Sequence, residues 1–105
     1  MTRAEAIKQV LQNLRVLDAI SNPAAEDAAA VGVRLDQERA RLGEVGLVWW
    51  DADAIPDAVS GAFCDLVASA CQNLFGKPYE AAGAQARIAA VKSSARRDVV
   101  KAEYF

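Results

Sequence analysis

Histidine is missing from this chain of 105 residues, and cysteine, proline and glycine are scarce. Without histidine, the protein lacks the commonest general base and the commonest metal ligand. Its two thiols, Cys64 and Cys71, are separated by two helical turns, which places them on one face about 10 Å apart, too far for a disulfide. A zinc site needs about four ligands, and no further cysteine or histidine pair exists. We therefore expect two buried core thiols and a reducing compartment.

Catalytic and cofactor-binding motifs are also missing. The chain has no glycine-rich phosphate loop, no Gly-x-Ser-x-Gly turn and no serine with a basic partner. The acidic cluster of Asp51, Asp53 and Asp57 has a faint similarity to a calcium loop, but Pro56 and Ala62 stand where such a loop needs glycine and glutamate. We interpret Asp53 and Asp57 as caps at the start of a helix. The sequence predicts no enzyme, no cofactor and no metal site.

Long apolar runs are a further absence. No uncharged stretch approaches the roughly 18 residues that a membrane-spanning helix needs, and the start "MTRAEAIKQ" has no apolar signal region. We expect a soluble protein made in the cytoplasm, with no membrane partner.

The composition favours one small all-α domain. Alanine, the best helix former, supplies more than a fifth of the chain, and no stretch alternates apolar and polar residues as a half-buried strand does. Apolar residues make up 53% and charged residues 25%, which is typical of a globular protein. We predict a small four-helix bundle over residues 1–98 and an extended C-terminal arm over residues 99–105.

The first two helices are indicated by their start signals. Thr2 and Glu5 have the spacing of a capping box, and an apolar stripe at helical spacing follows. Ser21 or Asn22 is expected to cap a second helix that runs from Pro23 to about residue 42. Gly32, which lies inside that helix, indicates a close helix crossing or a bend. The apolar stripe of the first helix consists of Ile7, Val10, Leu11 and Leu14.

The third and fourth helices are expected to start at Pro56 and Pro78. The third ends at Gly76 and is the most apolar, so it should be central; the fourth ends near Arg97. Trp49 and Trp50 precede the third helix, and because neighbours in extended chain point to opposite sides, we expect one in the core and the other capping the bundle or facing a partner. The expected buried face of the third helix comprises Val59, Phe63, Leu66, Val67, Ala70, Leu74 and Phe75, and the fourth carries a weak stripe of Ala84, Ile88 and Val91.

Charge is distributed unevenly although the net charge is only -2. The middle of the chain carries acids without bases, whereas the C-terminal part is mainly basic. Three interpretations stay open: solvated faces with dipole complementarity, a head-to-tail contact in which the acidic loop of one copy meets the basic helix of the next, or contact with DNA phosphates. The candidate basic residues are Arg87, Lys92, Arg96 and Arg97, and the candidate inter-subunit or tail-facing loop comprises Trp49, Trp50, Asp51 and Asp53.

The chain ends in the apolar segment "VVKAEYF". Apolar surface left in water costs about 25 cal/mol per Å². Either this segment folds back onto its own bundle or it binds a groove on a partner.

Several stretches together resemble a phage family, the podovirus-type head–tail adaptors, also called tail accessory or packaged-DNA stabilisation proteins. The resemblance covers nearly the whole chain and rests on the order of its motifs. These are the helix "NPAAEDAAAVGVRLDQERARL", the tryptophan loop and Ile-Pro-Asp in "GLVWWDADAIPDAVSGAF", the helix "DLVASACQNLFGKP" and the basic, aromatic-tipped end "ARRDVVKAEYF".

This resemblance implies an all-α subunit that assembles as a ring, commonly a dodecamer, beneath the portal protein of the virion. Such a ring extends the DNA channel, retains packaged DNA and presents a surface to the tail nozzle or tail tube. The C-terminal segment of the family grips the portal. Carried over to this sequence, the portal-binding arm would consist of Val99, Val100, Lys101, Ala102, Glu103, Tyr104 and Phe105.

A different class of function stays open beside it. The chain could be a small helical regulatory module that binds a partner or a nucleic acid through Arg87, Lys92, Arg96 and Arg97. The bases are too few for strong independent DNA binding, and any DNA binding by the isolated monomer would be sensitive to salt.

Overall fold

A computed structural model describes residues 1–18 and 21–103 of the chain, with side chains up to residue 94. These residues form four helices and no strand, so the predicted all-α class is confirmed. The helices are α1 (Arg3–Asn13), α2 (Ala25–Glu44), α3 (Asp57–Phe75) and α4 (Ala84–Glu103).

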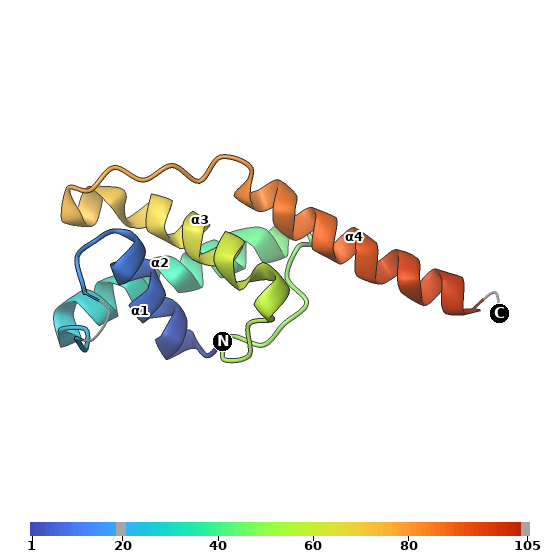
Figure 1. Ribbon diagram of the computed structural model, residues 1–105, viewed down its shortest axis with the longest axis horizontal. Coiled ribbons are helices and arrows are strands. Elements are labelled where there is room, and N and C mark those ends of the chain that lie inside the picture. Colours follow the sequence, from blue (N-terminus) through green and yellow to red (C-terminus); the bar gives the residue numbers. More distant parts are fainter. Residues whose placement is uncertain (19–20, 104–105) are drawn as a thin grey trace.

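The third helix organises the fold (Figure 1). Each of the other helices packs against α3, and α1 also packs against α2. Within the part of the chain that the structure describes, α4 contacts α3 and no other helix. The molecule measures 51 × 23 × 21 Å, and its long axis is extended by α4, whose C-terminal half projects past the other three helices (Figure 1).

Helix α1 begins as its sequence predicts. The backbone N–H of Glu5 donates to Thr2 Oγ1 at 3.1 Å, and the N–H of Thr2 donates to Glu5 Oε1 at 3.0 Å, which together form the capping box. These bonds to the carboxylate lower the pKa of Glu5. The four residues predicted for its inner stripe are all buried: Ile7, Val10, Leu11 and Leu14.

Helix α2 begins two residues later than predicted. The expected cap by Ser21 or Asn22 is wrong, because the N-cap is Ala24, whose backbone is extended (ψ 143°) and whose side chain cannot cap. Acidic residues in the first turn complement the positive end of the helix without such a cap.

The close approach predicted at Gly32 involves a side chain of α1. A Cβ at Gly32 would lie 2.7 Å from Arg3 Nη2, so the glycine leaves room for the guanidinium. Arg3 in turn binds both carboxylate oxygens of Asp36, at 3.2 and 3.0 Å, and this contact raises the pKa of Arg3. The contact sets how α1 lies across α2.

Helix α4 differs from the prediction at both ends. It starts at Ala84 rather than Pro78, because the preceding segment first runs back along α3 (Figure 1) and turns through Gly83, whose φ is +79°. The expected end near Arg97 is also wrong: the helix continues to Glu103, since no glycine or proline interrupts the alanine-rich sequence after Gly83.

The core is centred on α3. Phe63 is fully buried and is the largest of the fully buried side chains. One residue of the predicted apolar face is misplaced: Leu74 is 43% exposed, because it lies in the last turn of α3, beyond the body of the core. The other largest fully buried side chains are Leu11, Leu35, Leu42, Ile55 and Ile88.

Truncating Phe63 should therefore destabilise the protein strongly. We expect Phe63→Ala to lower the free energy of unfolding by about 3–5 kcal/mol, because it leaves a cavity among three helices. Leu74→Ala, on the same helix but 43% exposed, is the matched control and should cost less than about 1 kcal/mol. Urea unfolding followed by circular dichroism measures both, and equal losses would contradict the central place of Phe63.

Candidate functional site

The tryptophan loop, defined here as residues 45–56, joins α2 to α3 and carries the two tryptophans. Trp50 is only 6% exposed and meets the edge of Phe63 with ring centroids 5.8 Å apart, whereas Trp49 is 43% exposed. The two indoles are perpendicular, with centroids 5.0 Å apart. The prediction that one tryptophan is core is confirmed, and the buried one is Trp50.

An arginine that sequence reasoning missed fixes this loop to α2. Arg39 Nη2 donates a hydrogen bond to the backbone oxygen of Trp50 at 2.5 Å. Two other buried donors beside it, Arg39 Nε and Trp50 Nε1, have no hydrogen-bond partner among the residues that the structure describes. A buried donor without an acceptor costs about 1–3 kcal/mol, so an acceptor brought to this loop would be stabilising.

Of the two acids predicted beside the start of α3, Asp57 lies in its first turn, whereas the prediction for Asp53 is wrong. Asp53 Oδ1 accepts a hydrogen bond at 2.9 Å from the backbone N–H of Arg3, so it serves the first turn of α1. The N-cap of α3 is Pro56, without a side-chain cap bond, and Asp57 stands in the first turn with its carboxylate exposed. Asp51 is exposed as well. In residues 1–18 and 21–94, no group of three acidic or cysteine side chains could hold a metal ion.

Two of the four candidate bases have partners inside the subunit. Arg87 Nη2 lies 2.7 Å from Asp65 Oδ2, and the Tyr79 hydroxyl donates to the other oxygen of Asp65 at 2.6 Å. Burial and this carboxylate raise the pKa of Tyr79 to about 12. Lys92 Nζ donates to the backbone oxygen of Gly46 in the tryptophan loop. These contacts tie α4 to α3 and to the loop.

The remaining predicted site residues lie toward the end of α4. Arg96 and Arg97 belong to the helix, but their side chains are outside the described part of the chain. The arm predicted at residues 99–105 continues α4 through Val99, Val100, Lys101, Ala102 and Glu103, whereas Tyr104 and Phe105 lie outside the described residues. The structure thus brings Lys92 to the tryptophan loop.

Asp65 was missed by the sequence analysis, although one signal could have found it. It is the one acidic residue after the first turn of α3, the most apolar helix, and an acid so placed needs partners. Its partner Tyr79 comes from the α3–α4 connection, and its partner Arg87 comes from the first turn of α4.

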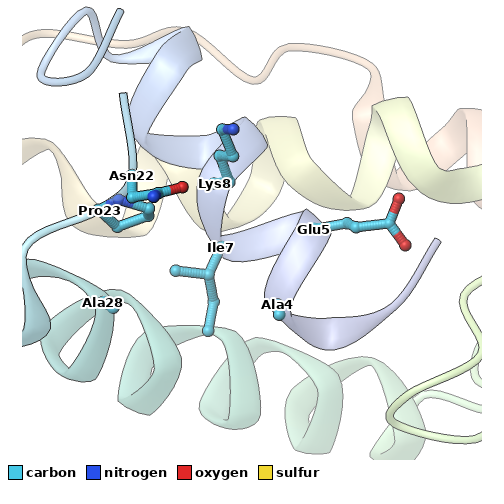
Figure 2. A pocket seen from close by; sticks show the side chains of 7 residues that line it. All are labelled: Ala4, Glu5, Ile7, Lys8, Asn22, Pro23 and Ala28. Atoms are coloured by element: carbon cyan, nitrogen blue, oxygen red, sulfur yellow. The ribbon is translucent and has the colours of Figure 1, made fainter. Parts of the chain in front are cut away.

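A hollow of about 360 Å³ lies between α1 and the start of α2 (Figure 2). Ile7 points from α1 toward α2 across it, while the charged ends of Glu5 and Lys8 point away from Ile7 (Figure 2). Its lining is completed by Ala4, Asn22, Pro23 and Ala28. The lining is mainly apolar.

Comparisons with protein families, with curated proteins and with solved structures find no match for this chain. The resemblance to head–tail adaptors therefore stays a prediction. None of the helices in the described residues is both long enough and apolar enough to cross a bilayer.

The two tryptophans should differ in access to solvent. In single-tryptophan variants, acrylamide should quench the emission of Trp49 (Trp50→Phe variant) several times more strongly than that of Trp50 (Trp49→Phe variant), because their exposures are 43% and 6%. Stern–Volmer titration measures the difference. Equal quenching in two folded variants would contradict the loop conformation.

The buried thiols should make the fold sensitive to alkali. Cys64 and Cys71 are buried and free, and desolvation raises the pKa of the Cys64 thiol from 9.0 to about 11. Above pH 9 the unfolded chain loses this proton first, so stability should fall as pH rises from about 9 to 11. Urea unfolding across this window should show a shallower fall in Cys64→Ala, where Cys71 and Tyr79 still contribute. An identical fall in both proteins would exclude Cys64 as a cause.

Proposed function

We propose that this protein is a structural virion protein, a head–tail adaptor that assembles as a ring beneath the portal. The observation that carries the proposal is the projecting half of α4, which leaves the body of the subunit and contacts none of the other helices except α3 (Figure 1). The resemblance of the sequence to head–tail adaptors indicates which assembly the protein would join.

The positions of the buried side chains along α4 support a binding role for its C-terminal end. A helix of 20 residues is about 30 Å long. Among residues 84–94, whose side chains the structure describes, Ala84 and Ile88 are fully buried and lie in the first two turns, and Val91 is half-buried. The sequence places Val99 and Val100 further along the helix. We propose that these two apolar residues contact another molecule, because apolar surface favours burial over exposure to water.

The arm of residues 99–105 is accordingly proposed to bind the portal protein. Each arm would contribute a modest apolar contact after the cost of ordering it. A ring presents one arm per subunit, and because the arms are tethered together, the joint would dissociate much more slowly than a single arm.

The tryptophan loop is proposed as the inter-subunit or tail-facing surface. Trp49 and Val45 are large apolar side chains that are 43% and 56% exposed there. A neighbouring subunit or a tail protein that covered Trp49 and Val45 would remove their apolar surface from water.

The uneven charge supports an arrangement of subunits around DNA. Because Arg87 and Lys92 have partners within the subunit, a head-to-tail contact or a DNA-facing channel would depend chiefly on Arg96 and Arg97. The exposed carboxylate of Asp51 is the acid available for such a contact. In the assembled virion, packaged DNA would pass through the ring with the portal above and the tail nozzle or tube below.

Deleting Tyr104 and Phe105 should weaken portal attachment without changing the fold. We expect the truncated protein to keep the helical circular dichroism and unfolding midpoint of the full chain, but to co-elute poorly with purified portal in size-exclusion chromatography. Electron micrographs of full-length protein mixed with portal should show an added ring. Lys101→Ala, within the arm but without loss of apolar surface, is the matched control.

Two results would overturn the proposal. A full-length protein that never joins the portal would exclude the adaptor function, and a truncation that becomes insoluble would place the two aromatic residues in the subunit's own core. Salt-sensitive DNA binding by the isolated monomer that is lost in an Arg96→Ala, Arg97→Ala variant would instead favour the regulatory module.

A further inference from the structure

A second pocket, of about 370 Å³, opens at the end of the bundle opposite the projecting half of α4. It lies where α1 and α3 both end, and the chain leaving each helix forms its walls. The residues that line it are Asn13, Leu14, Arg15, Lys77, Pro78 and Tyr79. In the part of the chain that the structure describes, no carboxylate lines this pocket. The hollow between α1 and α2 differs in this respect, because Glu5 lines it together with Lys8.

The side-chain groups of this pocket that have no partner among the described residues are donors. The side chains of Arg15 and Lys77 make no hydrogen bond or ion pair with any described residue, and both residues are exposed. Asn13 Oδ1 accepts a hydrogen bond from Gln9 Nε2 at 2.8 Å, which leaves the amide NH₂ of Asn13 as a third donor. Tyr79 is already bound to Asp65. Two cations and an amide without acceptors are the complement of an oxyanion.

The backbone at Arg15 gives a second, independent indication. Arg15 has a φ of +60°, and it is the one residue other than glycine with a positive φ in the described chain. It follows the C-cap of α1, a position where glycine is usual because it adopts this conformation without strain. The left-handed residue at the end of α3 is a glycine, the C-cap Gly76, with a φ of +62°. An arginine at a position that strains its backbone indicates that its side chain has a role.

Complementing the helix dipole explains only part of this arrangement. A cation at a helix C-terminus is favourable, and Arg15 and Lys77 each lie one residue past a C-cap. A cation anywhere in the last turn would serve that purpose equally well, and neither α1 nor α3 has one there. Arg15 and Lys77 both line the pocket, so their positive charge is concentrated in one hollow.

We propose that this pocket binds a phosphate group through Arg15, Lys77 and the Asn13 amide. The inference does not depend on the proposed adaptor function, because it concerns the opposite end of the subunit from the arm. The phosphate belongs either to a small molecule or to a nucleic-acid backbone, two sources with the same recognition chemistry.

The test uses the full chain and inorganic phosphate as the probe. Phosphate is titrated against chloride at equal ionic strength while backbone amide shifts are followed by NMR. We expect saturable shifts at residues 13–15, 77 and 79, and we expect Arg15→Gly to weaken the affinity about tenfold. The same variant should raise the melting temperature by about 3 °C, because glycine relieves the strain at positive φ. A gain in stability with a loss of binding is a result that a purely structural role would not produce.

Further variants separate charge from conformation. Lys77→Gln should also weaken binding, Arg15→Lys should keep most of it, and Lys8→Gln, which removes the same charge at the other hollow, should leave it unchanged. No saturable shift with phosphate, or equal affinity in Arg15→Gly and the parent protein, would overturn the proposal. A short DNA duplex that displaces phosphate from these amides would identify a nucleic-acid backbone as the source, and failure to displace it would identify a small phosphate.

Discussion

Burial of α3 is the constraint on which the rest of the structure depends. This helix is the most apolar of the four, and it can leave water only if the other three cover it. Phe63 occupies the middle of that contact, and Trp50 packs its indole against the same ring. The tryptophan loop has no regular structure of its own, but it is attached to α3 through this ring contact and to α2 through Arg39.

Charged contacts then set the angles at which the outer helices lie. Arg3 holds α1 to Asp36 of α2, and Arg87 holds α4 to Asp65 of α3. Exposed pairs of this kind contribute about 0–1 kcal/mol each, so they orient the helices more than they stabilise them. The C-terminal half of α4 projects past the other helices (Figure 1).

The two ends of the molecule differ in chemistry. At one end, α4 projects past the other helices and is proposed to bind other proteins (Figure 1). At the other end, Arg15 and Lys77 line the hollow that is proposed to bind a phosphate group. The two proposed contacts would thus use opposite ends of the molecule.

The sequence alone determined the presence of four helices, the capping box at Thr2 and the burial of the apolar stripe of α1, because these depend on residues within about four positions of each other. The prediction that α4 starts at Pro78 is wrong because the chain must first return along α3. No local sequence pattern indicates this return. Only the tertiary structure decided that Asp53 caps α1 rather than α3, and which partners Arg3 and Arg87 take. Those partners are separated by 50, 33 and 22 residues along the chain, and only the packing of helices on α3 brings them within hydrogen-bond distance.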